Sequence, residues 1–150
     1  MSGLVVIPIH NERGELIAYA GRSIDATEPK YRLPAGFRKA DVLFNLHRVS
    51  SREQVIVVEG FFDCMKVHQA GALEVVALMG SSLSDAQEYL LAQFARVIIF
   101  LDGDEAGRGA ARTIALRLGT KTFIKMIEVA DGEQPDQMSS EKIQTILGFG

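Results

Sequence analysis

The chain lacks the residues that build covalent or zinc-bound scaffolds, since its 150 residues include one cysteine and three histidines. With Cys64 alone, no internal disulfide can form, and the composition fits a reducing compartment. No Cys/His cluster has zinc-site spacing. Long hydrophobic runs and a signal-peptide pattern are also missing. We therefore expect a cytoplasmic protein without a membrane partner.

An overall positive charge is missing as well, and the net charge of −3 argues weakly against a nucleic-acid partner. The charge distribution argues the opposite. Residues 22–52 contain seven basic and three acidic residues, so this segment carries +4 and the remainder carries −7. A basic segment beside an acidic region suits a polyanion that is held by one part and acted on by the other. A solvated, charge-rich loop is an equally good interpretation of the charges alone.

A hydrophobic fraction of 47% is enough for the core of one ordinary domain. A β-hairpin is predicted from residues 4–9 and 16–20, followed by a long connection over 21–39 and a short helix over 43–47. After residue 52, strands alternate with helices, as in parallel α/β sheets. The predicted strands are 55–59, 75–78, 97–101 and 123–127. The predicted helices are 62–70, 84–94, 105–118 and 141–147, and Ser84 with Gln87 forms a capping-box signal.

Acidic residues follow the most apolar of these strands. The run 97–101 leads into Asp102, Gly103 and Asp104, the run 55–58 leads into Glu59, and Asp136 follows a later strand. In one parallel sheet these acids would meet at the same edge, where ligands of open α/β sheets bind. Clustered carboxylates need a cation or a proton between them. The pattern therefore predicts a site for Mg²⁺ or Mn²⁺.

Each acid alone also has a simpler explanation. Asp102 or Asp104 could cap the helix that follows, Asp63 could occupy a first helical turn, and Glu59 could pair with a lysine. The combination of acids at several strand ends favours the metal site.

Two stretches resemble the Toprim domain: Val-Glu-Gly-Phe-Phe-Asp at 58–63 and Phe-Leu-Asp-Gly-Asp-Glu-Ala-Gly-Arg at 100–108. Further stretches resemble bacterial primases of the DnaG type. These are Ala-Gly-Arg at 20–22, Pro-Lys-Tyr at 29–31, Phe-Arg-Lys at 37–39 and Met-Gly-Ser-Ser-Leu at 79–83. The resemblance implies a Toprim-type parallel sheet flanked by helices over residues 53–150. A small, basic hairpin-and-loop subdomain of primase-core type would precede it over residues 1–52.

The resemblance also implies roles for individual residues. Glu59 matches a glutamate that acts as general acid/base and metal contact, and Asp63 matches a supporting acid. Asp102 and Asp104 match the metal-binding pair, and we expect Asp136 to join them. Basic residues would hold template phosphates or the incoming nucleotide: Arg22, Lys30, Arg38 and Lys39. The chain departs from the primase pattern at Gln134, where an aspartate is usual, and at Phe61, where a tyrosine is usual.

The function implied is a nucleotidyl transferase that makes RNA primers on single-stranded DNA from ribonucleoside triphosphates, with a replicative helicase as a partner through domains outside this chain. Two alternatives remain. A Toprim nuclease would use the same acids, but the basic segment at 22–39 has no clear purpose there. A non-catalytic binding module would explain the lost acid at Gln134, although the retained acids Glu59, Asp102 and Asp104 oppose it.

Overall fold

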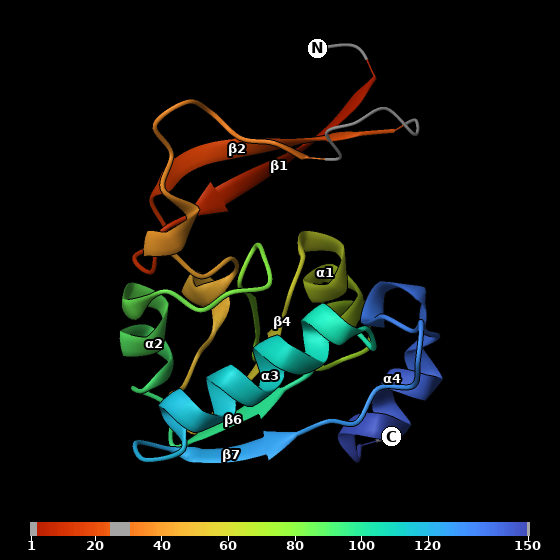
Figure 1. Ribbon diagram of the computed structural model, residues 1–150. Helices are drawn as coiled ribbons and strands as arrows, with labels where there is room; N and C mark the ends of the chain where they lie inside the picture. The colour runs from red at the N-terminus through yellow and green to blue at the C-terminus, as the bar shows by residue number, and fades with distance from the viewer. Residues whose placement is uncertain (1–2, 25–30, 150) are drawn as a thin grey trace.

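The computed structural model describes residues 3–24 and 31–149, which form two separate sheets (Figure 1). A small antiparallel sheet has the order β1-β2-β3, from β1 (Leu4–His10), β2 (Leu16–Ser23) and β3 (Tyr31–Arg32). A four-stranded parallel sheet has the order β5-β4-β6-β7. Its strands are β4 (Gln54–Val58), β5 (Val75–Ala77), β6 (Arg96–Ile99) and β7 (Phe123–Met126). The expected α/β class is confirmed.

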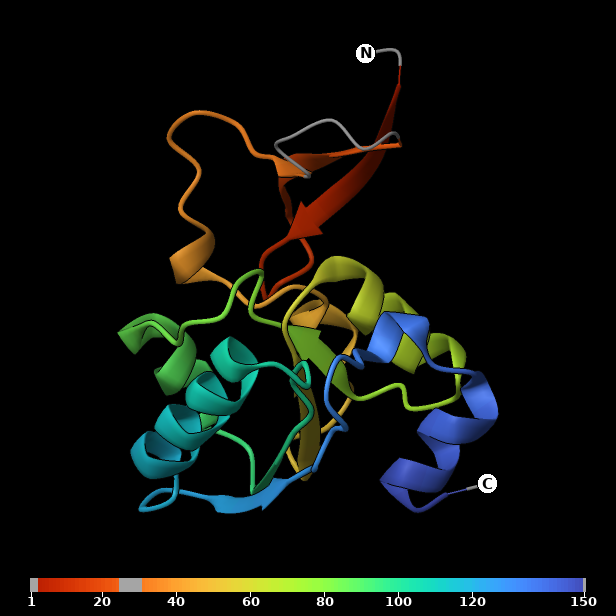
Figure 2. The same ribbon diagram turned by 45° about the vertical axis from the view of Figure 1, so that its right-hand side comes forward.

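Helices cover both faces of the parallel sheet. Figure 2 shows α2 and α3 on one side and α1 and α4 on the other. The helices are α1 (Phe61–Gln69), α2 (Asp85–Leu91), α3 (Glu105–Leu118) and α4 (Ser140–Leu147). Three short 3₁₀ turns are η1 (Lys39–Asp41), η2 (Leu46–Arg48) and η3 (Pro135–Gln137). No helix within 3–24 or 31–149 is long and apolar enough to cross a membrane.

The central strands β4 and β6 are buried on both faces, as their continuous apolar runs predict. Ile56 and Ile98 belong to one core, together with Val67 of α1. Val57 and Val97, which point the other way, belong to a second core that includes Ile114 of α3. Two cores on opposite faces therefore hold the ends of β4 and β6 in place, and acids follow both strands in the chain.

The small sheet is buried on one face only. Ile7 and Ile9 of β1, with Ala20 of β2, join the core that contains Phe61 of α1. On β2, Ile17 and Tyr19 remain 41% and 52% exposed. The sheet stands over the body of the molecule (Figure 1), and its packed face brings β2 and β3 above the carboxyl ends of the parallel strands.

The helix expected over residues 43–47 is wrong. Phe44 instead forms an isolated antiparallel bridge with Ala77, through hydrogen bonds of 3.0 and 3.1 Å. The next residue, Asn45, has a φ of 74°, which ends any right-handed helix, and its side-chain amide donates to the Val75 carbonyl at 2.9 Å. The segment covers the outer edge of β5, a long-range pairing that local propensity does not reveal.

Two further boundaries differ from the expectation. The connection expected over 21–39 contributes the end of β2 and the two residues of β3, with Arg22 paired opposite Tyr31. Helix α2 ends at Leu91 rather than near Phe94. The chain turns there because the amide of Ala95 bonds to the Arg52 carbonyl, which sets the start of β6 beside β4.

Candidate active site

A hollow of about 460 Å³ lies between the carboxyl ends of β4 and β6 and the small sheet, and we call it the crevice. Four carboxylates line one side of it: Glu59, Asp63, Asp102 and Asp136. Two cations, Arg22 and Lys39, line the other. The rest of its lining comes from Tyr31, Leu33, Gly60, Phe61, Met79, Gly80, Gln134 and Gln137. The crevice thus joins acids from the parallel sheet to bases from the N-terminal part.

Glu59 and Asp102 face each other because β4 and β6 are neighbours. The backbone amide of Asp102 donates to Glu59 Oε1 at 3.3 Å. Burial raises the pKa of Glu59, the bond from that amide lowers it, and the negative charges of Asp104 and Asp63 raise it. The pKa of Asp102 is raised to about 7, first by burial and then by the surrounding acids. Both groups therefore hold protons more tightly than free carboxylates do.

Asp63 connects the crevice to the turn that carries Asp136. Its carboxylate accepts hydrogen bonds from the amides of Gly60, at 3.1 Å, and Asp136, at 3.0 Å. Its pKa is raised to about 6, mainly by burial, while these amide bonds act in the opposite direction. Asp63 thus closes the first turn of α1 and also holds η3 in position, which makes it a positioning residue in this structure.

Two carboxylate oxygens in the crevice are buried without a hydrogen-bond partner among the described residues: Oδ1 of Asp102 and Oδ1 of Asp136. A buried, unpaired carboxylate oxygen is costly unless a cation or a proton reaches it. Hard divalent cations accept such oxygen ligands, so these residues fit a Mg²⁺- or Mn²⁺-type ion. Within 3–24 and 31–149, however, no three acid, histidine or cysteine side chains form a group that could hold a metal by themselves.

Asp104 has a different position from the one expected. It is the N-cap of α3, and its Oδ1 accepts the Gly107 amide at 2.6 Å. Its side chain is outside the lining of the crevice, although its charge still raises the pKa values of Glu59 and Asp102. The helix-capping interpretation therefore describes Asp104 here, while Asp102 lines the crevice together with Glu59, Asp63 and Asp136.

Arg22 is held between two aromatic rings on the basic side. Its guanidinium lies 4.5 Å from the ring centre of Phe62 and 5.5 Å from that of Tyr31. Its Nε atom is buried and makes no hydrogen bond to the described part of the chain. Stacking on both rings restrains the guanidinium and leaves its donors free for an anion.

Lys39 lies in the crevice beside the loop that follows β5. A Cβ added at Gly80 would come within 3.3 Å of Lys39 Nζ, so the amine lies directly against this glycine. The amides of Met79 and Gly80 both donate to the Glu59 carbonyl, at 2.8 and 3.3 Å. One loop therefore ties the basic side to the residue that follows β4.

The structure does not bring every expected basic residue into the crevice. Arg38 lies elsewhere, exposed, and pairs with Asp41 at 3.3 Å. Lys30 lies outside the described residues. Sequence reasoning missed the contact of Arg22 with Phe62, and it gave Gln137 no role. No sequence signal points to the contact with Phe62, because Arg22 and Phe62 are far apart in the chain and meet only in the fold.

Both parts of the chain match known protein families. Residues 56–139 match the family model described as Toprim-like. The chain belongs to the Toprim-like family. Residues 2–50 match a second model, the N-terminal domain of the DNA primase catalytic core. The resemblance to DnaG-type primases is therefore confirmed.

Individual relatives agree with both models. A DNA primase of Clostridium acetobutylicum is 34% identical over 141 residues, which are 89% of this chain and 24% of that protein. The crystal structure of the Aquifex aeolicus primase, containing zinc-binding and RNA polymerase domains, superposes with a TM-score of 0.84 at 31% identity, covering 97% of this chain and 40% of that one. A DnaG catalytic domain bound to single-stranded DNA superposes with a TM-score of 0.83 at 29% identity, covering 97% and 51%. The chain spans about a quarter of the length of the curated primases it matches.

Proposed function

We propose that this chain is the nucleotidyl transferase core of a DnaG-type primase, which makes RNA primers on single-stranded DNA. One observation carries the proposal: Asp102 and Asp136, each with a buried, unpaired carboxylate oxygen, line the same crevice as Arg22 and Lys39. Phosphoryl-type transfer needs positioning and charge neutralisation more than covalent chemistry, and this arrangement offers both.

The proposal assigns the two sides of the crevice to two parts of the chain. Residues 1–52 would form a small basic subdomain of primase-core type, and residues 53–150 would form the Toprim domain. The two family models support this division because one matches residues 2–50 and the other residues 56–139.

Asp102 and Asp136 would hold a Mg²⁺ or Mn²⁺ ion, with Glu59 and Asp104 close enough to Asp102 to raise its pKa. When bound, such an ion would neutralise phosphate charge and lower the pKa of an attacking hydroxyl. Mg²⁺ sites commonly use one or two carboxylates and complete their coordination with water and substrate phosphates. That pattern agrees with a crevice in which no three described side chains form a metal-binding group by themselves.

Glu59 would take or hold a proton during transfer. Its raised pKa brings it closer to neutral pH than a free carboxylate, and such tuning makes a carboxylate a more effective general base. Arg22 and Lys39 would hold phosphates of the template or the incoming ribonucleoside triphosphate, and Lys30 and Arg38 would contribute further positive charge. The DNA-bound DnaG relative supports single-stranded DNA as the partner.

The test is a product analysis on one gel. The purified chain is incubated with end-labelled single-stranded DNA, four labelled ribonucleotides and Mn²⁺, beside its Glu59→Gln variant. New RNA that the variant does not make is the expected result. Shortened DNA that depends on Glu59 would replace this proposal with a nuclease. Intact DNA without RNA, together with no binding of nucleotide or Mn²⁺, would refute it.

A further inference from the structure

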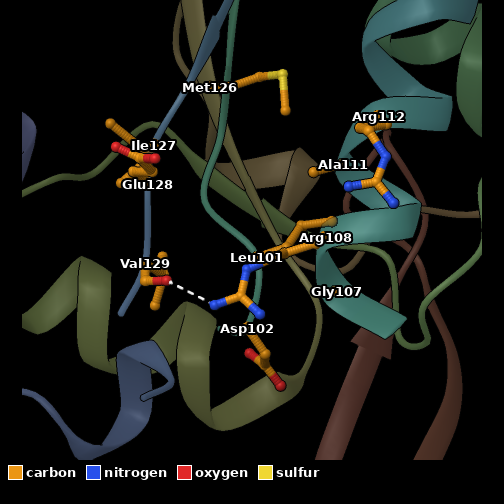
Figure 3. A pocket seen from close by; sticks show the side chains of 10 residues that line it. All are labelled: Leu101, Asp102, Gly107, Arg108, Ala111, Arg112, Met126, Ile127, Glu128 and Val129. Atoms are coloured by element: carbon orange, nitrogen blue, oxygen red, sulfur yellow. Dashed lines mark hydrogen bonds between the residues drawn. The ribbon is translucent and has the colours of Figure 1, made fainter. Parts of the chain in front are cut away.

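A second hollow, of about 280 Å³, also has Asp102 in its lining. It separates α3 from the segment 126–129, and we call it the α3 hollow (Figure 3). Its α3 wall includes the small residue Ala111, and Gly107 allows the helix to pack directly against the Asp102 carbonyl. Asp102 lines both hollows, so a ligand that extends past Asp102 would pass from one to the other.

Two guanidinium groups stand on the α3 side of this hollow. Arg108 and Arg112 are four residues apart on one helix, so they share a face. In Figure 3, Arg108 reaches across toward Val129, and Arg112 lies one turn further along the same wall. Arg108 pairs with Asp131 and donates to the Val129 carbonyl at 3.4 Å. Arg112 has no hydrogen bond or ion pair with any residue in the described ranges, so the fold assigns it no structural partner.

The opposite wall carries one apolar side chain, with an acid at its rim. Met126 is 47% exposed there, while the side chains of Ile127 and Val129 pack against the core on the other face of the sheet. Glu128 is exposed at the edge. Asp131, the partner of Arg108, is 93% exposed, and exposed ion pairs of this kind are weak. An anion could therefore replace Asp131 on Arg108 at little cost.

We propose that the α3 hollow binds one nucleotide unit, with its phosphate on Arg108 and Arg112 and its base against Met126. Paired guanidiniums match phosphate geometry, an exposed apolar side chain suits the flat face of a base, and the volume accommodates one unit rather than a folded strand. The choice of a nucleotide as ligand rests on the proposed function. The unit can come from a free ribonucleotide or from a nucleic-acid strand, because both offer the same phosphate and base.

Binding is measured in EDTA, by fluorescence anisotropy of a labelled twelve-nucleotide oligo-dT and, separately, by calorimetry with ATP. Arg112→Ala is expected to weaken binding roughly five- to tenfold and to lower the salt dependence of oligonucleotide binding by about one charge. Arg13→Ala is the matched control, because it removes the same charge from an exposed hairpin turn. Its affinity is expected to stay within about twofold of the wild type.

A large side chain that fills the α3 hollow tests the proposal independently of charge. Ala111→Trp is expected to weaken binding as much as Arg112→Ala, whereas Leu116→Trp, at an 80% exposed position on α3, leaves it unchanged. Loss for ATP alone identifies a free nucleotide, and loss for the oligonucleotide alone identifies a strand. If Arg112→Ala binds both probes as well as Arg13→Ala does, the proposal is overturned. A wild-type chain that makes no RNA would count against the proposed function but not against this binding, which needs neither metal nor catalysis.

Discussion

The two sheets of this molecule supply side chains of opposite charge to one crevice, and the acidic and basic side chains are positioned in different ways. Acids follow β4 and β6, which are buried on both faces between two cores. The bases come from a small sheet packed on one face and from the turn η1. We infer that the acidic side is built for fixed geometry. The basic side is held mainly by stacking and single contacts, such as those of Arg22 and Lys39.

The largest effect is expected on the acidic side. Asp102→Asn should reduce metal-dependent activity at least about 100-fold, because removing an essential acid costs that much or more. The same variant should melt at a higher temperature than the wild type, since it removes a buried carboxylate with raised pKa. Activity assays and thermal melts in EDTA check both parts. Asp85→Asn, at a fully exposed position, is the control, and a melting temperature lowered by Asp102→Asn would contradict the account.

The rigidity of the acidic side can be tested at Gly103, in the turn between Asp102 and Asp104. A Cβ at Gly103 would lie 2.0 Å from the Ala130 carbonyl oxygen, so Gly103→Ala must separate two turns that share hydrogen bonds of 2.8 and 2.9 Å. We expect a loss of about 2–3 kcal/mol in the free energy of unfolding. Gly109→Ala, in α3 with open space around its Cβ, should instead stabilise the protein by about 0.5–1 kcal/mol. Urea titrations of both variants measure the contrast, and equal effects would argue against a tightly packed turn.

The buried acids should also give an unusual pH dependence. The pKa of Asp102 is about 7 in the fold against 3.8 for the free group, and that of Asp63 is about 6. The folded state therefore binds more protons than the unfolded state between about pH 4 and 7, and these groups make the metal-free protein less stable as pH rises through that window. His47, whose pKa is lowered by burial, acts in the opposite direction below its free value of 6.5.

Comparing the wild type with Asp102→Asn separates the contribution of Asp102 to the pH dependence from that of His47, which both proteins share. The stability gained by Asp102→Asn should grow as the pH rises from 5 to 7.5, and melting curves at fixed ionic strength measure it. A difference that is constant over this range would show that Asp102 titrates as an ordinary carboxylate.

The smallest effect is expected on the basic side. Phe62→Leu removes the ring 4.5 Å from the Arg22 guanidinium, a contact worth about 0.5–1 kcal/mol, which weakens binding of single-stranded DNA about two- to fivefold. Phe123→Leu is a matched control because it removes a similar ring from Arg96, at 5.3 Å, on the edge strand β7. Fluorescence anisotropy compares the two, and equal affinities would show that stacking does not position Arg22.

The sequence was most informative where structure is local or fully apolar. Helix α3 begins at Glu105 and ends at Leu118 as predicted, and the runs at 55–58 and 97–101 mark the two central strands. The meeting of Glu59 with Asp102 followed from parallel strands that end at one edge.

The rest depends on contacts between distant residues. The bridge of Phe44 to Ala77 replaced a predicted helix, and the contact of Arg22 with Phe62 joins a strand of the small sheet to helix α1. The motif suggested that Asp102 and Asp104 act together. In the structure Asp104 immediately precedes α3 and caps it, while Asp102 lines the crevice.

The central claim is that the unpaired oxygens of Asp102 and Asp136 form a divalent-cation site. Calorimetric titration of the chain with Mn²⁺, with and without ATP, tests it most directly. The account predicts binding that ATP strengthens and that Asp102→Asn and Asp136→Asn each abolish, while Asp85→Asn retains it. Mn²⁺ binding that is unchanged in both crevice variants, or no binding by the wild type even with ATP, would contradict it.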